Sequence, residues 1–179
     1  VENMLGDREK KTHSLTIDKD IPGKVTALAI NRDGNTLYAG TAEGHLVRWK
    51  MNDAGKVTSS ETVEIPGRTA VTALTMVFGD VSVAVGDADG NVATWMPVRG
   101  EDGQPRLQLI HELSRHDEAV ETILPSRRNK ALLSLGGGGG VCLDYMTSER
   151  QLVTLGDDHP LSLMSYSPRG NAVIGLDRQ

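Results

Sequence analysis

One stretch of sequence occurs twice in this chain, and this repeat limits the possible folds more than any other feature. The segment GTAEGHLVRW begins at Gly40, and GDADGNVATW begins at Gly86, which is a spacing of 46 residues. A second motif, written first as VTALAI, occurs four times and starts at Val25, Val71, Val120 and Leu161. Self-similarity at this period indicates an array of structural units that pack on one another.

Each copy of the unit has the same internal order of runs and turns. A turn follows the first apolar run, as in NRDGN from Asn31, and a second short run comes next, as in TLYAG. A Gly- or Asp-containing turn then precedes a third run, and a more polar fourth run closes the unit. Short runs rich in β-branched residues between such turns are typical of hairpins. We therefore predict four antiparallel strands per unit, and no window has the apolar spacing of a stable helix.

The first run, VTALAI from Val25 to Ile30, has apolar residues on both of its faces. Such a pattern predicts a strand that is covered on both sides. Four-stranded sheets of about 45 residues with two covered faces are the blades of a β-propeller. We therefore predict an all-β fold, a partial β-propeller of about three and a half four-stranded blades.

The predicted organisation is a linker at residues 1–12, followed by the partial propeller at residues 13–179. The units lie near residues 25–70, 71–119, 120–160 and 161–179, and residues 13–21 are expected to form an outer strand ahead of them. Propellers close with about four to eight blades, so an open arc leaves an apolar face at each end. We expect another part of the ring to cover these faces, either from a longer chain or from a second copy in a homo-oligomer.

Residues 113–155 resemble a WD40 repeat. Arg115 and His116 stand where that family usually has Gly-His, and Leu143 and Asp144 lie near its Trp-Asp site. The resemblance implies a structural role for His116, as a donor to an Asp in a turn of its own blade. It also implies a rigid, non-catalytic platform that binds a protein partner.

The same resemblance implies a structural hydrogen-bond network, of which this chain has only fragments. Its expected members are His116, Asp144, Trp49 and Trp95. The expected remnants pair Trp95 with Asp87 or Asp89, and Trp49 with Thr41.

The charge of the chain argues against nucleic acid as a partner. The 179 residues carry a formal net charge of −5, with a pI near 5.5 and 38% hydrophobic residues. Binding to a polyanion favours clustered Lys and Arg. The one dense basic cluster is Arg127, Arg128 and Lys130, which is either a solvated hairpin tip or a contact for a protein partner or an anionic ligand.

No catalytic or metal-binding arrangement stands out in the sequence. The run Gly136–Gly140 is interpreted as a hairpin turn and not a phosphate loop, because no Gly-Lys-Ser/Thr follows it. Asp87 and Asp89 resemble half of a calcium loop, but Asp-Gly is also a common hairpin turn. Cys142 lies within a strand, which favours an inert buried thiol. We expect no enzyme activity, no cofactor and no metal.

As a whole, the chain also resembles the extracytoplasmic propeller insert of bacterial phosphate ABC transporter permeases. The resemblance implies a periplasmic domain of a membrane protein that regulates the permease or docks its substrate-binding protein. The two ends of the chain favour this resemblance, because the chain starts at Val1 without a methionine and ends just after an apolar run. The alternatives are a cytoplasmic WD40-like scaffold and a ligand-sensing propeller that uses its central channel.

Overall fold

The computed structural model describes residues 21–77, 79–113, 115–155, 159–167, 169 and 172–177. These residues form 14 strands and one 3₁₀ turn, Pro66–Arg68. Among them, no helix is long and apolar enough to cross a membrane. The predicted linker at residues 1–12 and nearly all of the predicted outer strand at residues 13–21 lie outside the described part of the chain.

The strands form three four-stranded antiparallel sheets and one hairpin, each built from consecutive segments. The first sheet contains β1 (Val25–Ile30), β2 (Thr36–Thr41), β3 (His45–Met51) and β4 (Val57–Glu64). The second contains β5 (Val71–Met76), β6 (Val83–Asp87), β7 (Val92–Arg99) and β8 (Pro105–Glu112). The third contains β9 (Val120–Pro125), β10 (Ala131–Gly136), β11 (Val141–Tyr145) and β12 (Arg150–Leu155). The hairpin pairs β13 (Leu161–Tyr166) with β14 (Val173–Asp177).

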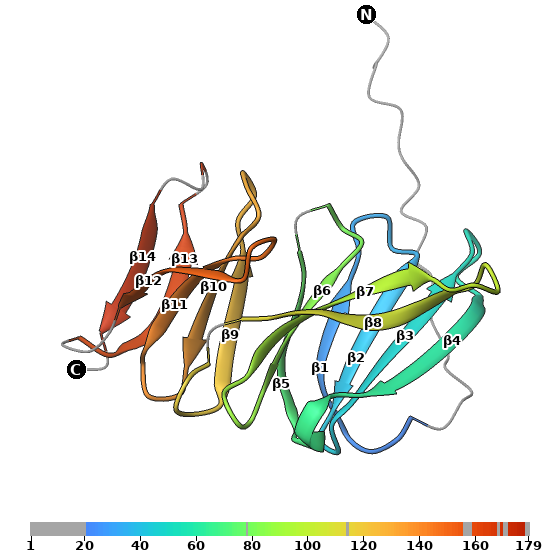
Figure 1. The fold of residues 1–179 in the computed structure, drawn as a ribbon, viewed down its shortest axis with the longest axis horizontal. Helices are drawn as coiled ribbons and strands as arrows, with labels where there is room; N and C mark the ends of the chain where they lie inside the picture. Colours follow the sequence, from blue (N-terminus) through green and yellow to red (C-terminus); the bar gives the residue numbers. More distant parts are fainter. Residues whose placement is uncertain are drawn as a thin grey trace, which may run out of the picture.

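The sheets follow one another along the long axis of the molecule, with β1–β4 at one end and β13–β14 at the other (Figure 1). The first strands of neighbouring sheets pack together, β1 beside β5 and β5 beside β9. The sheets are therefore the blades of an arc. The predicted fold class, a partial propeller of four-stranded blades, is confirmed.

Three of the four hydrophobic clusters lie between neighbouring blades. The first joins Tyr38 and Leu46 of the first blade to Val71 and Val83 of the second. The second continues from Ala84 and Val92 to Val120 and Ile123, and the third joins Leu133 and Leu135 to Met164 of the hairpin. The fourth cluster lies within the first blade and consists of Ala39, Val47 and Trp49. Each blade therefore buries apolar side chains against its neighbour.

The repeated glycines at positions 40 and 86 have a common packing role. A Cβ atom on Gly40 would overlap the side chain of Val71, and a Cβ atom on Gly86 would overlap the side chain of Val120. Each glycine lies in the second strand of its blade, and each valine begins the first strand of the next blade. The sequence repeats here because the blade contact repeats.

Strand β1 differs from the sequence prediction, which had both of its faces covered. Leu28 and Ile30 are 61% and 56% exposed. The equivalent residues of β5, Leu74 and Met76, pack against the cluster that joins the first two blades. The prediction was wrong for β1 because the described residues place no blade on its outer side.

The opposite end of the arc is also apolar and exposed. In the terminal hairpin, Leu163, Ile174 and Leu176 are 60%, 64% and 58% exposed. The outer strand β12 is exposed along its whole length, because the hairpin beside it contains only the two inner strands of a blade. The arc therefore has two apolar end faces, one on β1 and one on β13–β14.

Candidate functional site

A cavity of about 970 Å³ lies where the four innermost strands end. Its lining comes from the turns and strand ends that follow β1, β5, β9 and β13, and it includes Arg32, Met76, Asp80, Leu124, Arg127 and Tyr166. All four blades therefore contribute to a single hollow. Ligand sites are commonly concave and of this size, with a few polar groups on a mostly apolar wall.

The turns of the first two blades are joined at the edge of this cavity. The backbone N–H of Arg32 donates a hydrogen bond to Asp80 Oδ2 at 2.6 Å. Asp80 has a φ of 60°, which is typical of a tight turn. Its carboxylate therefore stabilises the turn after β1 from within the turn after β5. The Arg32 side chain is exposed, and it forms no ion pair with any described residue.

The predicted basic cluster is divided by the structure. Arg127 lines the cavity, whereas Arg128 and Lys130 lie in the same turn outside its lining. The turn itself is held by Ser126, whose buried Oγ accepts hydrogen bonds from the N–H groups of Arg128 at 3.2 Å and Asn129 at 3.4 Å. Arg127 is therefore the member of the cluster that is placed to meet a ligand in the cavity.

The fourth wall of the cavity carries a phenol. The hydroxyl of Tyr166 is buried and has no hydrogen-bond partner among the described residues. Burial raises the pKa of Tyr166 above its ordinary value, so the hydroxyl keeps its proton and is a potential donor.

Solved structures share this architecture. One is described as the WD40 repeats of RRP9, with a TM-score of 0.64, and another as U3-55K, with a TM-score of 0.63. Each is 15% identical to this chain, and each comparison covers 82% of this chain and 43% of the other. The fold is that of part of a WD40 propeller. No protein-family model and no curated protein matches the sequence.

This WD40-type arc spans less than half the length of those two structures. At 15% identity the likeness defines the fold and not the activity.

The predicted network of the WD40-type arc is centred on His116 in the third blade. His116 Nε2 lies 2.8 Å from Ser134 Oγ of β10, and both side chains are buried. The resemblance implies an Asp in a blade turn as the partner, but the turn after β10 consists of glycines, and the partner is a serine in the strand. Burial lowers the pKa of His116, and the negative charges of Asp144 and Asp117 oppose this shift.

The strand register gives Asp144 an unexpected position. Trp95 pairs with Val83 in the second blade, and Asp144 pairs with Leu132 at the equivalent place in the third. Asp144 is 1% exposed, so a buried carboxylate stands where the first two blades have a buried tryptophan. The negative charge of Asp144 opposes the lowering of the His116 pKa by burial, so the two predicted members of the network from this blade interact electrostatically.

The two tryptophans belong to other blades. Trp49 lies in β3 and Trp95 in β7, and both are buried. Neither indole N–H has a hydrogen-bond partner among the described residues. Thr41 Oγ1 instead accepts a hydrogen bond from the N–H of His45 at 3.1 Å, within its own turn. The tryptophans are packing residues of the first two blades.

The acidic turn after β6 is also self-contained. Asp87 Oδ1 accepts hydrogen bonds from the N–H groups of Asp89 and Asn91, both at 2.9 Å, and Oδ2 accepts one from Asn91 Nδ2 at 2.8 Å. These bonds are typical of a side chain that stabilises its own turn. Among the described residues, no group of three or more His, Cys, Asp or Glu side chains is arranged to hold a metal. Cys142 is buried in β11.

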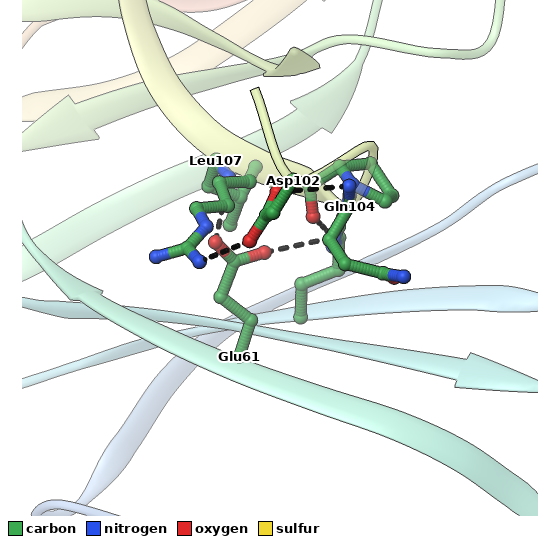
Figure 2. Close-up of polar contacts among 7 residues, drawn as sticks. Glu61, Asp102, Gln104 and Leu107 are labelled. Atoms are coloured by element: carbon green, nitrogen blue, oxygen red, sulfur yellow. Dashed lines mark hydrogen bonds and ion pairs between the residues drawn. The ribbon is translucent and has the colours of Figure 1, made fainter. Parts of the chain in front are cut away.

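A buried ion pair that the sequence pattern does not predict joins the first two blades. Arg48 Nη2 lies 2.7 Å from Glu61 Oε2 and donates to the carbonyl oxygen of Pro105 at 3.2 Å. Glu61 Oε1 accepts a hydrogen bond from the N–H of Leu107 in β8 at 2.7 Å (Figure 2). The position of Arg48 between the apolar residues Val47 and Trp49 is the one feature of the sequence that indicates this buried ion pair.

An exposed ion pair joins Asp102, in the turn before β8, to a residue of β8 itself (Figure 2). Arg106 Nη2 lies 2.6 Å from Asp102 Oδ2, and the two side chains are 67% and 47% exposed. The hydrogen bond from Arg106, with a smaller effect from the N–H of Gln104, lowers the pKa of Asp102. This pair shapes the turn, whereas the Arg48–Glu61 pair joins two blades.

Proposed function

We propose that this chain is a non-catalytic protein-interaction platform, an arc of WD40-type blades that binds further protein on its two apolar end faces. The observation that carries the proposal is a difference in exposure at equivalent positions. Leu28 of β1 is 61% exposed, whereas Leu74 of β5 packs against the preceding blade. At the other end, Leu163 is 60% exposed, whereas Met164 beside it packs on the third blade.

The end faces are large enough in apolar content to favour association. The exposed aliphatic residues are Leu28 and Ile30 at one end, and Leu163, Ile174 and Leu176 at the other. Burying one such side chain fully contributes about 1.5 to 3 kcal/mol. Contiguous exposed apolar patches of this kind mark sites of protein–protein contact.

Two kinds of protein fit these faces. A second copy, joined head to tail, would give a ring with eight innermost strands, because each copy supplies β1, β5, β9 and β13. Eight is within the range of about four to eight blades in which propellers close. Further blades of a longer protein would offer the same kind of face. In both cases the isolated chain is expected to associate through these faces.

Light scattering on the purified chain tests the proposal. We expect a solution mass above the 19.2 kDa of one copy, and a twofold value for the head-to-tail dimer. Replacing Leu28→Glu, or separately Ile174→Glu, should return the mass to one copy, because either change puts a charge into the contact. Val81→Glu is the matched control, since Val81 is 54% exposed but lies in a turn and not on an end face.

A solution mass equal to that of a monomer, for the unmodified chain at high micromolar concentration, would contradict the proposal. Association that persists in both end-face variants would contradict it as well. Circular dichroism spectra of all variants show whether each remains folded. A dimer lost in the Val81 variant as well would assign the contact to another surface.

The narrower placement of this platform, in the periplasmic part of a phosphate ABC transporter permease, is a separate proposal. The solved structures above support a WD40-type protein-binding fold and lend no support to a transporter or to a compartment. Apolar spans of about 20 residues in the sequence that flanks this segment in its gene would favour the permease. Further units of the same period without such spans would favour a soluble scaffold.

A further inference from the structure

We propose that the cavity at the ends of the innermost strands binds an acidic peptide segment of a protein partner, with Arg32 and Arg127 holding its carboxylates. This inference rests on the proposed function as a protein-interaction platform, and it assigns a second surface to it. The two arginines come from turns of the first and third blades and line the same hollow. Arginine is well suited to a carboxylate because its planar fork of donors can bind both oxygens.

The charges of the two arginines are available to a ligand. Six ion pairs join described residues elsewhere in the molecule, and neither arginine takes part in any of them. The carboxylate nearest in the lining, Asp80, is engaged by the backbone N–H of Arg32. An incoming carboxylate would therefore compete with water for these guanidinium groups and would not have to displace an existing ion pair.

The rest of the lining favours a peptide over a simple ion. Met76, Val77, Leu124 and Pro125 form an apolar part of the wall, which suits an aliphatic side chain between acidic ones. Tyr166 brings a buried hydroxyl that has no partner among the described residues and that is a donor for a carboxylate or a peptide carbonyl. A volume of about 970 Å³ accommodates several residues of an extended chain.

A nucleic acid fits these observations less well. The chain carries a formal net charge of −5, so its overall field opposes the approach of a polyanion. Asp80 in the lining would repel successive phosphates, and the cavity offers one tyrosine but no stack of aromatic side chains among its lining residues. An acidic peptide has fewer and more widely spaced charges than a nucleic acid, so it pays less of this penalty while still pairing with the two arginines.

Fluorescence anisotropy with a short fluorescein-labelled peptide of Glu, Leu and Ser tests the inference on the 179-residue chain. The matched probe replaces each Glu by Lys, and a third probe is a labelled single-stranded oligonucleotide. We expect saturable binding of the acidic peptide alone, with an affinity that falls as salt is raised.

The variants are Arg127→Glu and Arg32→Glu, and each should lower the affinity for the acidic peptide by about tenfold or more. Arg128→Glu is the matched control, because it makes the same charge change in the same exposed turn without touching the lining. It should change the affinity by less than about threefold, as expected for long-range charge alone. Tyr166→Phe should weaken binding by a few-fold through loss of the hydroxyl.

The inference is overturned if the acidic peptide does not bind, if Arg127→Glu and Arg128→Glu have equal effects, or if the oligonucleotide binds more tightly than the peptide. Competition by inorganic phosphate as strong as by the unlabelled peptide would also overturn it, because the site would then recognise a simple anion. The solution mass of the Arg127 variant is expected to match that of the unmodified chain. Failure of peptide binding with intact self-association would therefore reject this inference alone, and the end-face proposal would stand.

Discussion

Strands β6 and β14 occupy the same place in their blades and have opposite surroundings. Every residue of β6 is buried, and every residue of β14 is exposed. The two strands are similar in composition, VAVGD against VIGLD, and each pairs with the first strand of its own blade. The difference arises from the neighbours, because β6 lies between two other blades and pairs with β7, whereas β14 is the edge strand of a two-stranded sheet at the end of the arc (Figure 1).

This comparison shows how contacts between blades bury apolar strands. Three of the four hydrophobic clusters join neighbouring blades. An exposed hydrophobic strand at the end of the arc is therefore consistent with a correctly folded chain. Strand β14 has the composition of an interior strand, and its outer face is of the kind that packs against another blade.

The largest expected effect comes from placing a charge at equivalent positions of the two strands. Ala84 of β6 is 0% exposed and Ile174 of β14 is 64% exposed. They pair with Thr75 and Ser165 at equivalent positions of their first strands, on the face that meets the following blade in β6. Ala84→Asp should cost more than about 4 kcal/mol of unfolding free energy, because it buries an unpaired carboxylate. Ile174→Asp should cost less than about 1 kcal/mol. Urea denaturation at low protein concentration measures both, and equal losses would contradict the role given to the neighbouring blades.

The second prediction compares two arginines, Arg48 between the first two blades and Arg106 near the start of β8. Arg48→Ala leaves Glu61 and the Pro105 carbonyl without their partner in a buried contact between blades. It should cost about 2 to 4 kcal/mol, below the range for a fully buried pair because the Glu61 side chain is 22% exposed. Arg106→Ala removes only an exposed pair within a turn and should leave the unfolding free energy nearly unchanged. A large loss of unfolding free energy in Arg106→Ala and none in Arg48→Ala would contradict the assignment of Arg48 to the contact that joins the blades.

The smallest expected effect concerns pH and the buried histidine of the third blade. Burial lowers the pKa of His116 below the ordinary value of 6.5 that it has when unfolded. Below pH 6.5 the unfolded chain therefore binds a proton that the folded chain excludes, and stability falls as the pH decreases towards the folded pKa. This one group contributes a slope of at most about 1.4 kcal/mol per pH unit.

His116→Gln is the control for this effect, because glutamine can still donate to Ser134 but does not titrate. Urea denaturation of both proteins between pH 7 and pH 5 measures the difference. The slope attributed to His116 should be absent in the variant, and identical pH profiles would show that the histidine does not control stability in this range.

Much of the fold was predictable from the sequence. The repeated motif placed the start of β1, β5, β9 and β13 at the residues where they begin, because these strands pack against one another and keep the same composition. The runs ALLSLG, VCLDY and RQLVTL likewise correspond to β10, β11 and β12. The exposure of Leu28 was not predictable from the strand pattern alone, since an end strand and an interior strand have the same alternation.

The cavity was only partly predictable. Arg127 was noticed because three basic residues occur within four positions, but nothing local separates it from Arg128, and only the turn geometry directs one of them to the cavity. Arg32 and Tyr166 are distant from it in sequence. They approach it because the turns that follow the first strands of all four blades lie on one side of the arc, which is a consequence of topology. The exchange of tryptophan for Asp144 depended on strand register and was not visible in the composition of β11.

The two ends of the arc are different surfaces, one formed by β1 and the other by the β13–β14 hairpin. Contact between them in two copies is heterologous, and it gives a closed ring only if the rotation from copy to copy divides a full turn. Any other rotation leads to a growing fibre with the same local contact. A substitution that alters the twist of the last hairpin would then be detected first as turbidity or filaments, while each subunit remained correctly folded.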